Sequence, residues 1–190
     1  MASLRQLFDS LSNEQRRNQD LLVSLAFALR SFTNLHRFLE LVPVVASRLV
    51  GVDGALIVPF QSDGRLWRDQ LQAVPVEQSQ DLFRRLASFQ PGESVGFGTD
   101  DAQVLALDRL VQRCLPKAGL FATSVVVRGR CRGRLYVFDP TSELVWTEVH
   151  RRHAQLVADL AGVAIENDLM LQDARRHERV DRQLSIGAEI

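Results

Sequence analysis

Cysteine and lysine are scarce in this chain of 190 residues, and neither sign of charge prevails. The two cysteines, Cys114 and Cys131, are too few for a disulfide scaffold and lack the CxxC or Cys/His spacing of a zinc site. Lys117 is the single lysine, and 23 basic residues balance 23 acidic ones to a formal charge of zero. No overall field therefore draws the chain to nucleic acid or to an anionic membrane, and we expect neither as a partner.

Long apolar runs are also missing. No stretch approaches the ~20 consecutive apolar residues of a membrane-spanning helix. The N-terminus lacks the basic start and continuous apolar segment of a signal peptide. Together with the low cysteine content, these absences predict a soluble, cytoplasmic protein, and the length predicts one domain with helical extensions.

The first fifty or so residues have the apolar spacing of two helices. Leucines recur mostly at three-to-four-residue spacing over residues 3–32, which predicts a first helix whose polar stretch SNEQRRNQD is either a solvated interruption or an uncovered helical face. Thr33 or Asn34 can cap a second helix, and Gly51 can end it. Pro43 lies inside this second helix and, because it removes one backbone donor, is expected to bend it.

From residue 54 onward the apolar period becomes that of strands. The runs 54–60 and 66–74 flank the turn sequence QSDGR, which predicts a β-hairpin. A helix is predicted next, because apolar residues recur at helical spacing at Leu82, Leu86 and Phe89. A glycine-rich loop, QPGESVGFGTD, separates it from a further helix predicted over residues 101–115.

The segment VVVRGRCRGRLYVFDP places four arginines within seven residues, between two apolar runs. The apolar runs predict two strands, and Gly129 can adopt the positive φ of a turn over Arg128–Cys131. We therefore expect the arginines to be solvated at the end of a hairpin. A phosphate site is disfavoured because no helix N-terminus follows, and contact with another anion, a nucleic acid or a protein partner is the alternative.

After Thr147 the sequence contains no proline and is predicted to form one helix to the last residue. Over ~43 residues such a helix extends roughly 65 Å, far beyond the width of a domain of this size. Part of it should therefore project and find a partner, as in a parallel coiled-coil linker. A frayed tail is the alternative.

The four histidines form no metal motif. His150 and His153 are three residues apart, but no third ligand lies close to them in sequence. We expect them, together with His36 and His177, on the surface of helices.

Two stretches carry a resemblance to a known family: VDGALIVPFQSDGRLW, and GRLYVFDPTSELVWTEVHRRHAQLVADLAGVAIENDLM nearer the C-terminus. Over roughly residues 33–169 the chain resembles a GAF domain. The resemblance implies an α+β fold with a GAF-like antiparallel sheet flanked by helices, long N- and C-terminal helices, and a ligand-sized pocket on one face. It divides the chain into an N-terminal helical segment (1–32), a GAF-like domain (33–168) and a C-terminal signalling helix (169–190).

The last residues carry a second resemblance. The sequence VDRQLSIGAEI is similar to the linker helix that leads from such sensor domains into PPM-type serine phosphatases. This resemblance implies that the chain is an input module for an effector that follows it. Adenylate cyclases and histidine kinases are the alternative outputs.

The ligand motifs of two GAF subgroups are missing from the sequence. It has no Cys-His dipeptide, which bilin-attaching members carry, and it lacks the Asn-Lys-Phe-Asp-Glu constellation of cyclic-nucleotide members. We therefore expect no cofactor and a pocket that is apolar or unfilled. The aromatic residues expected to line it, each with a place in the core as the alternative, are Trp67, Phe97, Phe121, Tyr136 and Phe138.

The function that the resemblance implies is that of a non-enzymatic sensory or regulatory domain. Such a domain would form a homodimer through its terminal helices and relay the state of a small-molecule ligand or a protein partner to a C-terminal effector such as a serine phosphatase. The dimer surface is expected to use Leu21, Leu22, Leu25, Leu29, Leu171, Ala174 and Leu184. The alternatives are a GAF-fold redox enzyme of the free methionine sulfoxide reductase type, using Cys131, or a partner-binding scaffold without a ligand.

Overall fold

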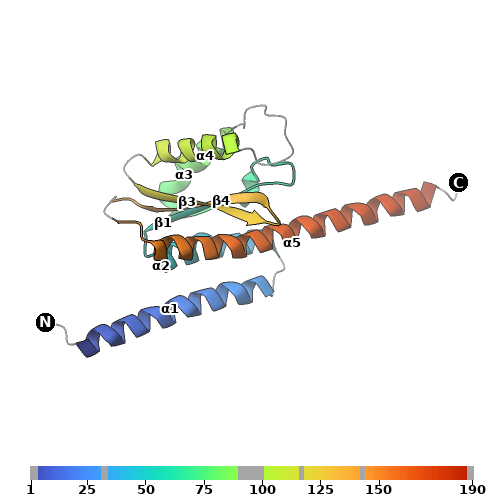
Figure 1. The fold of residues 1–190 in the computed structure, drawn as a ribbon. Helices are drawn as coiled ribbons and strands as arrows, with labels where there is room; N and C mark the ends of the chain where they lie inside the picture. The colour runs from blue at the N-terminus through green and yellow to red at the C-terminus, as the bar shows by residue number, and fades with distance from the viewer. Residues whose placement is uncertain (1–3, 31–33, 90–100, 116–117, 142–143, 188–190) are drawn as a thin grey trace.

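The structure, a computed structural model, describes residues 4–30, 34–89, 101–115, 118–141 and 144–187 (Figure 1). Its elements, in chain order, are α1 (Leu4–Arg30), α2 (Leu35–Val50), β1 (Gly54–Pro59), the 3-10 turn η1 (Arg68–Gln70), β2 (Gln72–Val74), α3 (Val76–Ser88), α4 (Asp101–Cys114), β3 (Gly119–Val127), β4 (Arg130–Asp139) and α5 (Glu148–Gly187). The strands form one antiparallel sheet in the order β2-β1-β4-β3. Helices α2 and α5 cover one face and α3 and α4 the other, while α1 packs on α2 and α5 (Figure 1). The predicted α+β class is confirmed.

Helix α2 begins and ends where its sequence predicts. The Asn34 side chain accepts a hydrogen bond from the His36 amide at 2.8 Å, which satisfies one of the donors left over at a helix start. Gly51 adopts a left-handed φ of 78° and donates its amide to the Ser47 carbonyl at 2.8 Å. Between these caps the helix continues through Pro43, which is buried.

The central strands are buried on both faces, so the sheet separates two apolar cores. On β1, Ala55 and Ile57 face the core under α2 and α5, whereas Leu56 and Val58 face the core under α3 and α4. This division follows from the two-residue period of a strand. The apolar run 54–60 has no polar residue at alternate positions, and burial on both sides of the strand explains why.

The predicted hairpin partner of β1 is wrong over most of its length. Of the run 66–74, only Gln72–Val74 pairs with β1, and Leu66 makes a single bridge to Phe60. The Trp67 amide donates to the Pro59 carbonyl at 2.9 Å, after which the chain turns through η1 with local hydrogen bonds. The intervening Arg-Asp-Gln residues of η1 have weak strand preference, so the local turn replaces the ladder there.

A two-residue turn joins β3 and β4. Arg128 and Gly129 have φ values of 52° and 74°, and paired left-handed residues of this kind match the twist of a hairpin. The predicted turn at this place is confirmed. Further along the hairpin, Val126 pairs with Cys131 but Val125 pairs with Gly133, so Arg132 is the additional residue of a β-bulge.

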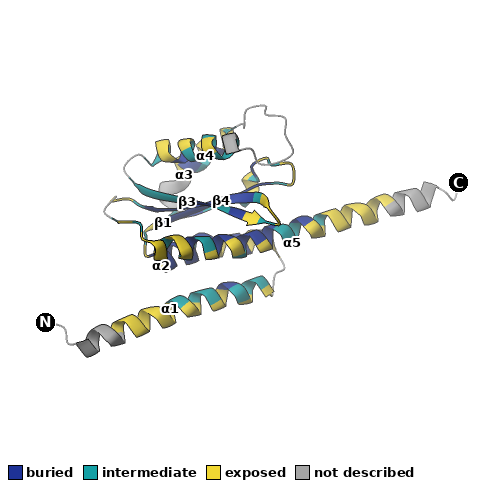
Figure 2. Cartoon of the chain, in the orientation of Figure 1, coloured by how far each residue is buried: buried dark blue, intermediate teal, exposed yellow. Residues whose placement is uncertain are grey.

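Helix α5 has two halves with different surroundings. From its start to Leu169 one side of the helix is buried against β3 and α2, and beyond Leu169 the helix runs past the body of the molecule, with mostly exposed side chains as far as Val180 (Figure 2). Gly162 allows the close approach to β3, because a Cβ there would lie 2.6 Å from a methyl carbon of Val127. The predicted long exit helix is confirmed over Glu148–Gly187. Among the described residues, none of the helices combines the length and apolar character needed to cross a bilayer.

Candidate functional site

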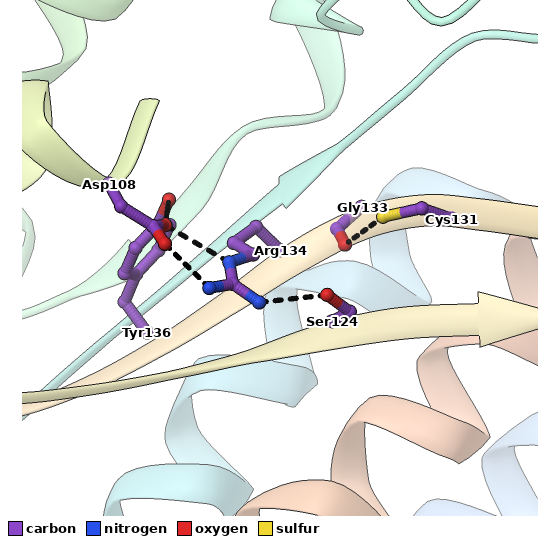
Figure 3. Close-up of polar contacts among 6 residues, drawn as sticks. All are labelled: Asp108, Ser124, Cys131, Gly133, Arg134 and Tyr136. Atoms are coloured by element: carbon purple, nitrogen blue, oxygen red, sulfur yellow. Dashed lines mark hydrogen bonds and ion pairs between the residues drawn. The ribbon is translucent and has the colours of Figure 1, made fainter. Parts of the chain in front are cut away.

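A polar cluster lies between α4 and the sheet, on the face opposite α5 (Figure 3). Arg134 donates from Nε to Oδ1 of Asp108 at 3.0 Å and from Nη2 to Oδ2 at 2.6 Å. Tyr136 donates its hydroxyl to the same Oδ1 at 2.7 Å, and Arg134 Nη1 donates to Ser124 Oγ at 2.8 Å. One carboxylate is therefore held by a two-point guanidinium fork and a phenol.

The secondary structure places each of these groups. Arg134 and Tyr136 are two residues apart on β4 and so share a face, and Ser124 of β3 lies directly opposite Arg134 in the strand register. Asp108 is next to Leu107 on α4, whose side chain, like that of Val111 one turn later, is fully buried in the core on this face. The apolar stripe that docks α4 thereby carries a carboxylate toward the sheet.

The cluster is largely shielded from water. The side chains of Arg134 and Asp108 are 15% and 27% exposed, and Tyr136 is fully buried. Burial on its own lowers the pKa of Arg134, but the hydrogen bonds and negative charge of Asp108 outweigh it and raise that pKa. Burial, reinforced by the Asp108 charge, raises the pKa of Tyr136 well above its ordinary value. Arg134 is therefore a permanent cation, and Tyr136 a permanent hydrogen-bond donor at neutral pH.

Chemically, this arrangement binds a carboxylate. A guanidinium fork and a phenol recognise a planar anion with fixed geometry, and a buried ion pair with these additional bonds is well satisfied. Within the described ranges, no three His, Cys, Asp or Glu side chains gather closely enough to hold a metal ion.

The second ion pair of this strand lies on the other face of the sheet. Arg132 donates from Nε to Oε2 of Glu166 on α5 at 3.1 Å, and these side chains are 10% and 14% exposed. The bulge sends Arg132 to this face although Arg134, two residues later, faces α4. Gly133 lies between them where β1 comes close, because a Cβ there would be 2.7 Å from the Val58 carbonyl oxygen.

The expectation that all four arginines are solvated is therefore half wrong. Arg128 and Arg130 are exposed at the turn, as predicted, whereas Arg132 is buried and Arg134 half-buried, each in an ion pair. Their partners are far away in sequence and sit on the inner faces of helices. The signal that could have found them is an acidic residue on the apolar side of a predicted helix, as Asp108 is beside Leu107.

The structure does not bring the predicted pocket aromatics together. Tyr136 and Phe138 are buried on the α3/α4 face, where the Phe138 ring lies against Gly54. Trp67 and Phe121 pack on the opposite core, under α2 and α5. Phe97 lies outside the described residues. Only Tyr136 belongs to the polar cluster.

Phe121 instead joins a small aromatic group at the start of α5. Its ring centroid lies 5.7 Å from that of Trp146, and the Arg151 guanidinium lies 5.8 Å from it. The His150 ring meets Trp146 edge-on at 6.2 Å. These contacts fix the entry into α5 rather than line the face under α4.

The predicted dimer surface is only partly available in this structure. Leu25 is buried in the core of its own chain, and Leu21, Leu22 and Leu29 are half-buried against the same core. Leu171 and Ala174 are exposed on the projecting half of α5. The side chain of Leu184 lies outside the described part of the chain.

An exposed apolar stripe on α5 was missed from the sequence. Its members recur every seven residues and are between 42% and 57% exposed: Val149, Leu156, Val163 and Met170. In the sequence this stripe cannot be separated from the adjacent buried one, because both have helical spacing. Only the packing against the sheet shows which apolar residues remain outside.

The histidines and cysteines form no recognisable reactive group. His36 is exposed beside Glu40, with 3.5 Å between Nε2 and Oε1, but His153 is half-buried, with Nδ1 3.1 Å from the Leu49 carbonyl oxygen. The expectation of four surface histidines therefore holds for His36 and His177, which are exposed, whereas His150 and His153 are half-buried. Cys131 donates its thiol to the Gly133 carbonyl at 3.3 Å, and burial raises the pKa of the half-buried Cys114 thiol.

Comparison with solved structures identifies the fold. The GAF domain assigned to a sensor histidine kinase from Pseudomonas syringae pv. tomato superposes with a TM-score of 0.53 at 13% identity, over 88% of this chain and 97% of that chain. A bacteriophytochrome from R. palustris matches at 0.46 and 16% identity, over 96% of this chain and 41% of its own. The photoproduct state of a GAF domain from Synechocystis sp. PCC6803 matches at 0.48 and 16% identity, over 76% and 99%.

The first of these structures shows that the chain has a GAF-like α+β fold. The other two superpose less well, and the fold assignment does not depend on them. No protein-family model matches the sequence, and no curated protein does either.

Proposed function

We propose that this chain is a non-enzymatic sensory or regulatory domain that forms a homodimer through its terminal helices and relays the state of a ligand or partner to an effector. The GAF-like fold supports the sensory role, since a structure that superposes on this chain with a TM-score of 0.53 is a GAF domain assigned to a sensor histidine kinase. The polar cluster under α4 supports a ligand-binding role too, because its guanidinium and phenol hold a carboxylate, that of Asp108, in a fixed geometry.

Helix α5 carries most of the support for the dimer. The helix is 40 residues long, and the part after Leu169 extends beyond the body of the molecule. A helical extension without a partner is only marginally stable in water. The seven-residue spacing from Val149 to Met170 is that of one of the two apolar positions of a coiled-coil heptad. Burying side chains that are half exposed contributes roughly 1 kcal/mol each, so four from each copy contribute about 8 kcal/mol. Association itself costs about 4–15 kcal/mol, so contacts of the projecting half of α5 must add to this stripe.

The two ion pairs of β4 offer a mechanism for the relay. Arg134 ties the strand to α4 through Asp108, and Arg132 ties it to α5 through Glu166. A change in the position of α4 would therefore move Arg134 and the neighbouring bulge, whose Arg132 is paired with α5. Such a change biases the arrangement of the paired helices, which the effector then reads.

Sedimentation of the full chain tests the dimer. We expect the mass of a dimer for the unaltered chain and that of a monomer for Val163→Glu, because a carboxylate in the seam cannot be buried. Val145→Glu is the matched control, since Val145 is still more exposed but lies before α5, and it should remain dimeric. A variant lacking residues 1–32 and 170–190 should associate more weakly than the full chain. A monomer mass for the unaltered chain would refute the proposal.

The effector we propose is a PPM-type serine phosphatase, on the resemblance of residues 180–190 to the linker of such enzymes. A histidine kinase or an adenylate cyclase is the competing output. With a phosphatase domain joined after Ile190, Val163→Glu should change its turnover while Val145→Glu leaves it unchanged. Equal turnover for the two variants would exclude this output.

A further inference from the structure

We propose that Arg134, Tyr136 and Ser124 form a receptor for a small monocarboxylate, and that Asp108 of α4 occupies this receptor as an internal stand-in for the ligand. The proposal rests on the sensory role above, for which it supplies the chemical class of the input. The residues that would bind the ligand lie on the sheet, and Asp108, the group to be displaced, lies on a helix packed over them (Figure 3).

The donors of the site all belong to the sheet. Arg134 Nη1 donates to Ser124 Oγ, so one of the bonds that orient the guanidinium comes from β3 and does not involve α4. Tyr136 projects from the same face of the same strand, and its hydroxyl points to the atom that Nε of Arg134 also contacts. Three donors from β4 therefore converge on one carboxylate position.

The surroundings define the rest of the ligand. The buried side chains of this core next to the cluster are apolar, among them Leu107, Val111 and Phe138. A guanidinium in such surroundings is unfavourable without an anion, so the site is seldom open and Asp108 is displaced mainly when another carboxylate replaces it. An apolar body attached to that carboxylate would meet apolar side chains. An aliphatic or aromatic monocarboxylic acid fits both conditions.

Asp108 is suited to being displaced. It is the more exposed partner of the pair, and as a residue on the surface of a helix it can regain water when it leaves. Because Leu107 and Val111 dock the same helix, the exchange would shift α4 relative to β4. The internal carboxylate competes with the ligand, so the apparent affinity is lowered by the fraction of time for which the site is open.

The test uses the fact that Tyr136 is the only tyrosine of the chain. With isotopically labelled tyrosine, the ring signals in a nuclear magnetic resonance spectrum report on this site alone. Benzoate is the probe, and benzamide, which has the same body without the charge, is the matched ligand control. We expect a saturable shift with benzoate in the unaltered full chain and none with benzamide.

Three variants separate the proposal from a purely structural ion pair. Asp108→Asn removes the competing carboxylate, so the benzoate concentration for half-saturation should be at least about tenfold lower than in the unaltered chain. The double variant Asp108→Leu/Arg134→Met removes both charges without leaving either unpaired, and should not respond to benzoate. Glu166→Gln alters the comparable pair on the other face and should leave the benzoate affinity unchanged.

The proposal is overturned if benzoate and benzamide shift the ring signals alike, or if Asp108→Asn binds benzoate no more tightly than the unaltered chain. Neither result would alter the mass of the dimer in sedimentation. A failure of the receptor is thus distinguishable from a failure of the proposed sensory dimer, which the seam variant tests separately.

Discussion

Arg132 and Arg134, separated by a single glycine on β4, point to opposite faces of the sheet and pair with helices on either side of it. Regular alternation would place both on one face, and the bulge at Arg132 breaks that rule. Two buried ion pairs therefore connect α4, β4 and α5 within three residues. This connection determines what several substitutions should do.

Removal of Glu166 should destabilise the fold strongly. Glu166→Ala leaves the Arg132 guanidinium buried without its carboxylate, and breaking a buried ion pair in this way costs about 3–5 kcal/mol. Unfolding in urea, followed by circular dichroism, measures the loss in free energy. The double variant Arg132→Met/Glu166→Leu removes both charges and should recover most of it. A double variant no more stable than Glu166→Ala would show that the pair is needed for more than charge balance.

Substitution of Gly162 sets two effects of opposite sign against each other. Alanine in place of glycine inside a helix gains about 1 kcal/mol. The added Cβ would lie 2.6 Å from Val127 Cγ2 and 3.2 Å from Val125 Cγ1, and overpacking of this kind costs about 1–3 kcal/mol. We expect Gly162→Ala to be destabilised in thermal unfolding. Gly162→Ala/Val127→Ala should then exceed Val127→Ala alone in stability, because the helical gain remains and the overlap is reduced.

Much of this fold follows from local patterns in the sequence. The cap at Asn34, the stop at Gly51 and the turn at Gly129 are set by side chains or φ values within a few residues, and all three are found where the sequence places them. The long α5 follows from an apolar period without proline. Strand β2 is shorter than predicted because its limits depend on backbone bonds made by β1 and η1.

The candidate site is less accessible to such reasoning. Its four members come from α4, β3 and β4, and nothing local connects Asp108 with Arg134 twenty-six positions later. The arginine cluster drew attention to the correct strand, but the bulge decides which arginine faces which helix. The bulge is a property of the pairing between β3 and β4, beside the close approach of β1 to Gly133, and is not encoded in either strand alone.

Alkaline pH should unfold the protein through Tyr136. Its pKa is raised by burial and by the Asp108 charge, so the unfolded chain releases the phenol proton at about pH 10 while the folded chain retains it. Stability is therefore fully present below that pH and falls as the pH rises further. Because no other tyrosine is present, phenolate absorbance reports this group alone and should appear together with unfolding.

Tyr136→Phe is the control for that prediction. Without the hydroxyl, Asp108 loses one donor, which costs about 1 kcal/mol at neutral pH. Above pH 10, the free energy of unfolding of the variant should fall less steeply with pH than that of the unaltered chain. Part of the fall should remain, because burial also raises the pKa of the Cys114 thiol. Phenolate absorbance that appears in the unaltered chain while it is still folded would contradict the buried hydrogen bond.

The projecting half of α5 should be helical only in the dimer. Residues 170–187 extend beyond the body of the molecule, where an isolated helix of this length is marginal in water. Helix content measured by far-ultraviolet circular dichroism should therefore rise with protein concentration, over the range in which sedimentation shows the dimer forming. Val163→Glu should abolish this dependence and keep the lower helix content, whereas Val145→Glu should behave like the unaltered chain. A helix content that stays constant while the mass doubles would contradict this prediction. It would mean that residues 170–187 are helical in the monomer and that dimerisation does not change their order.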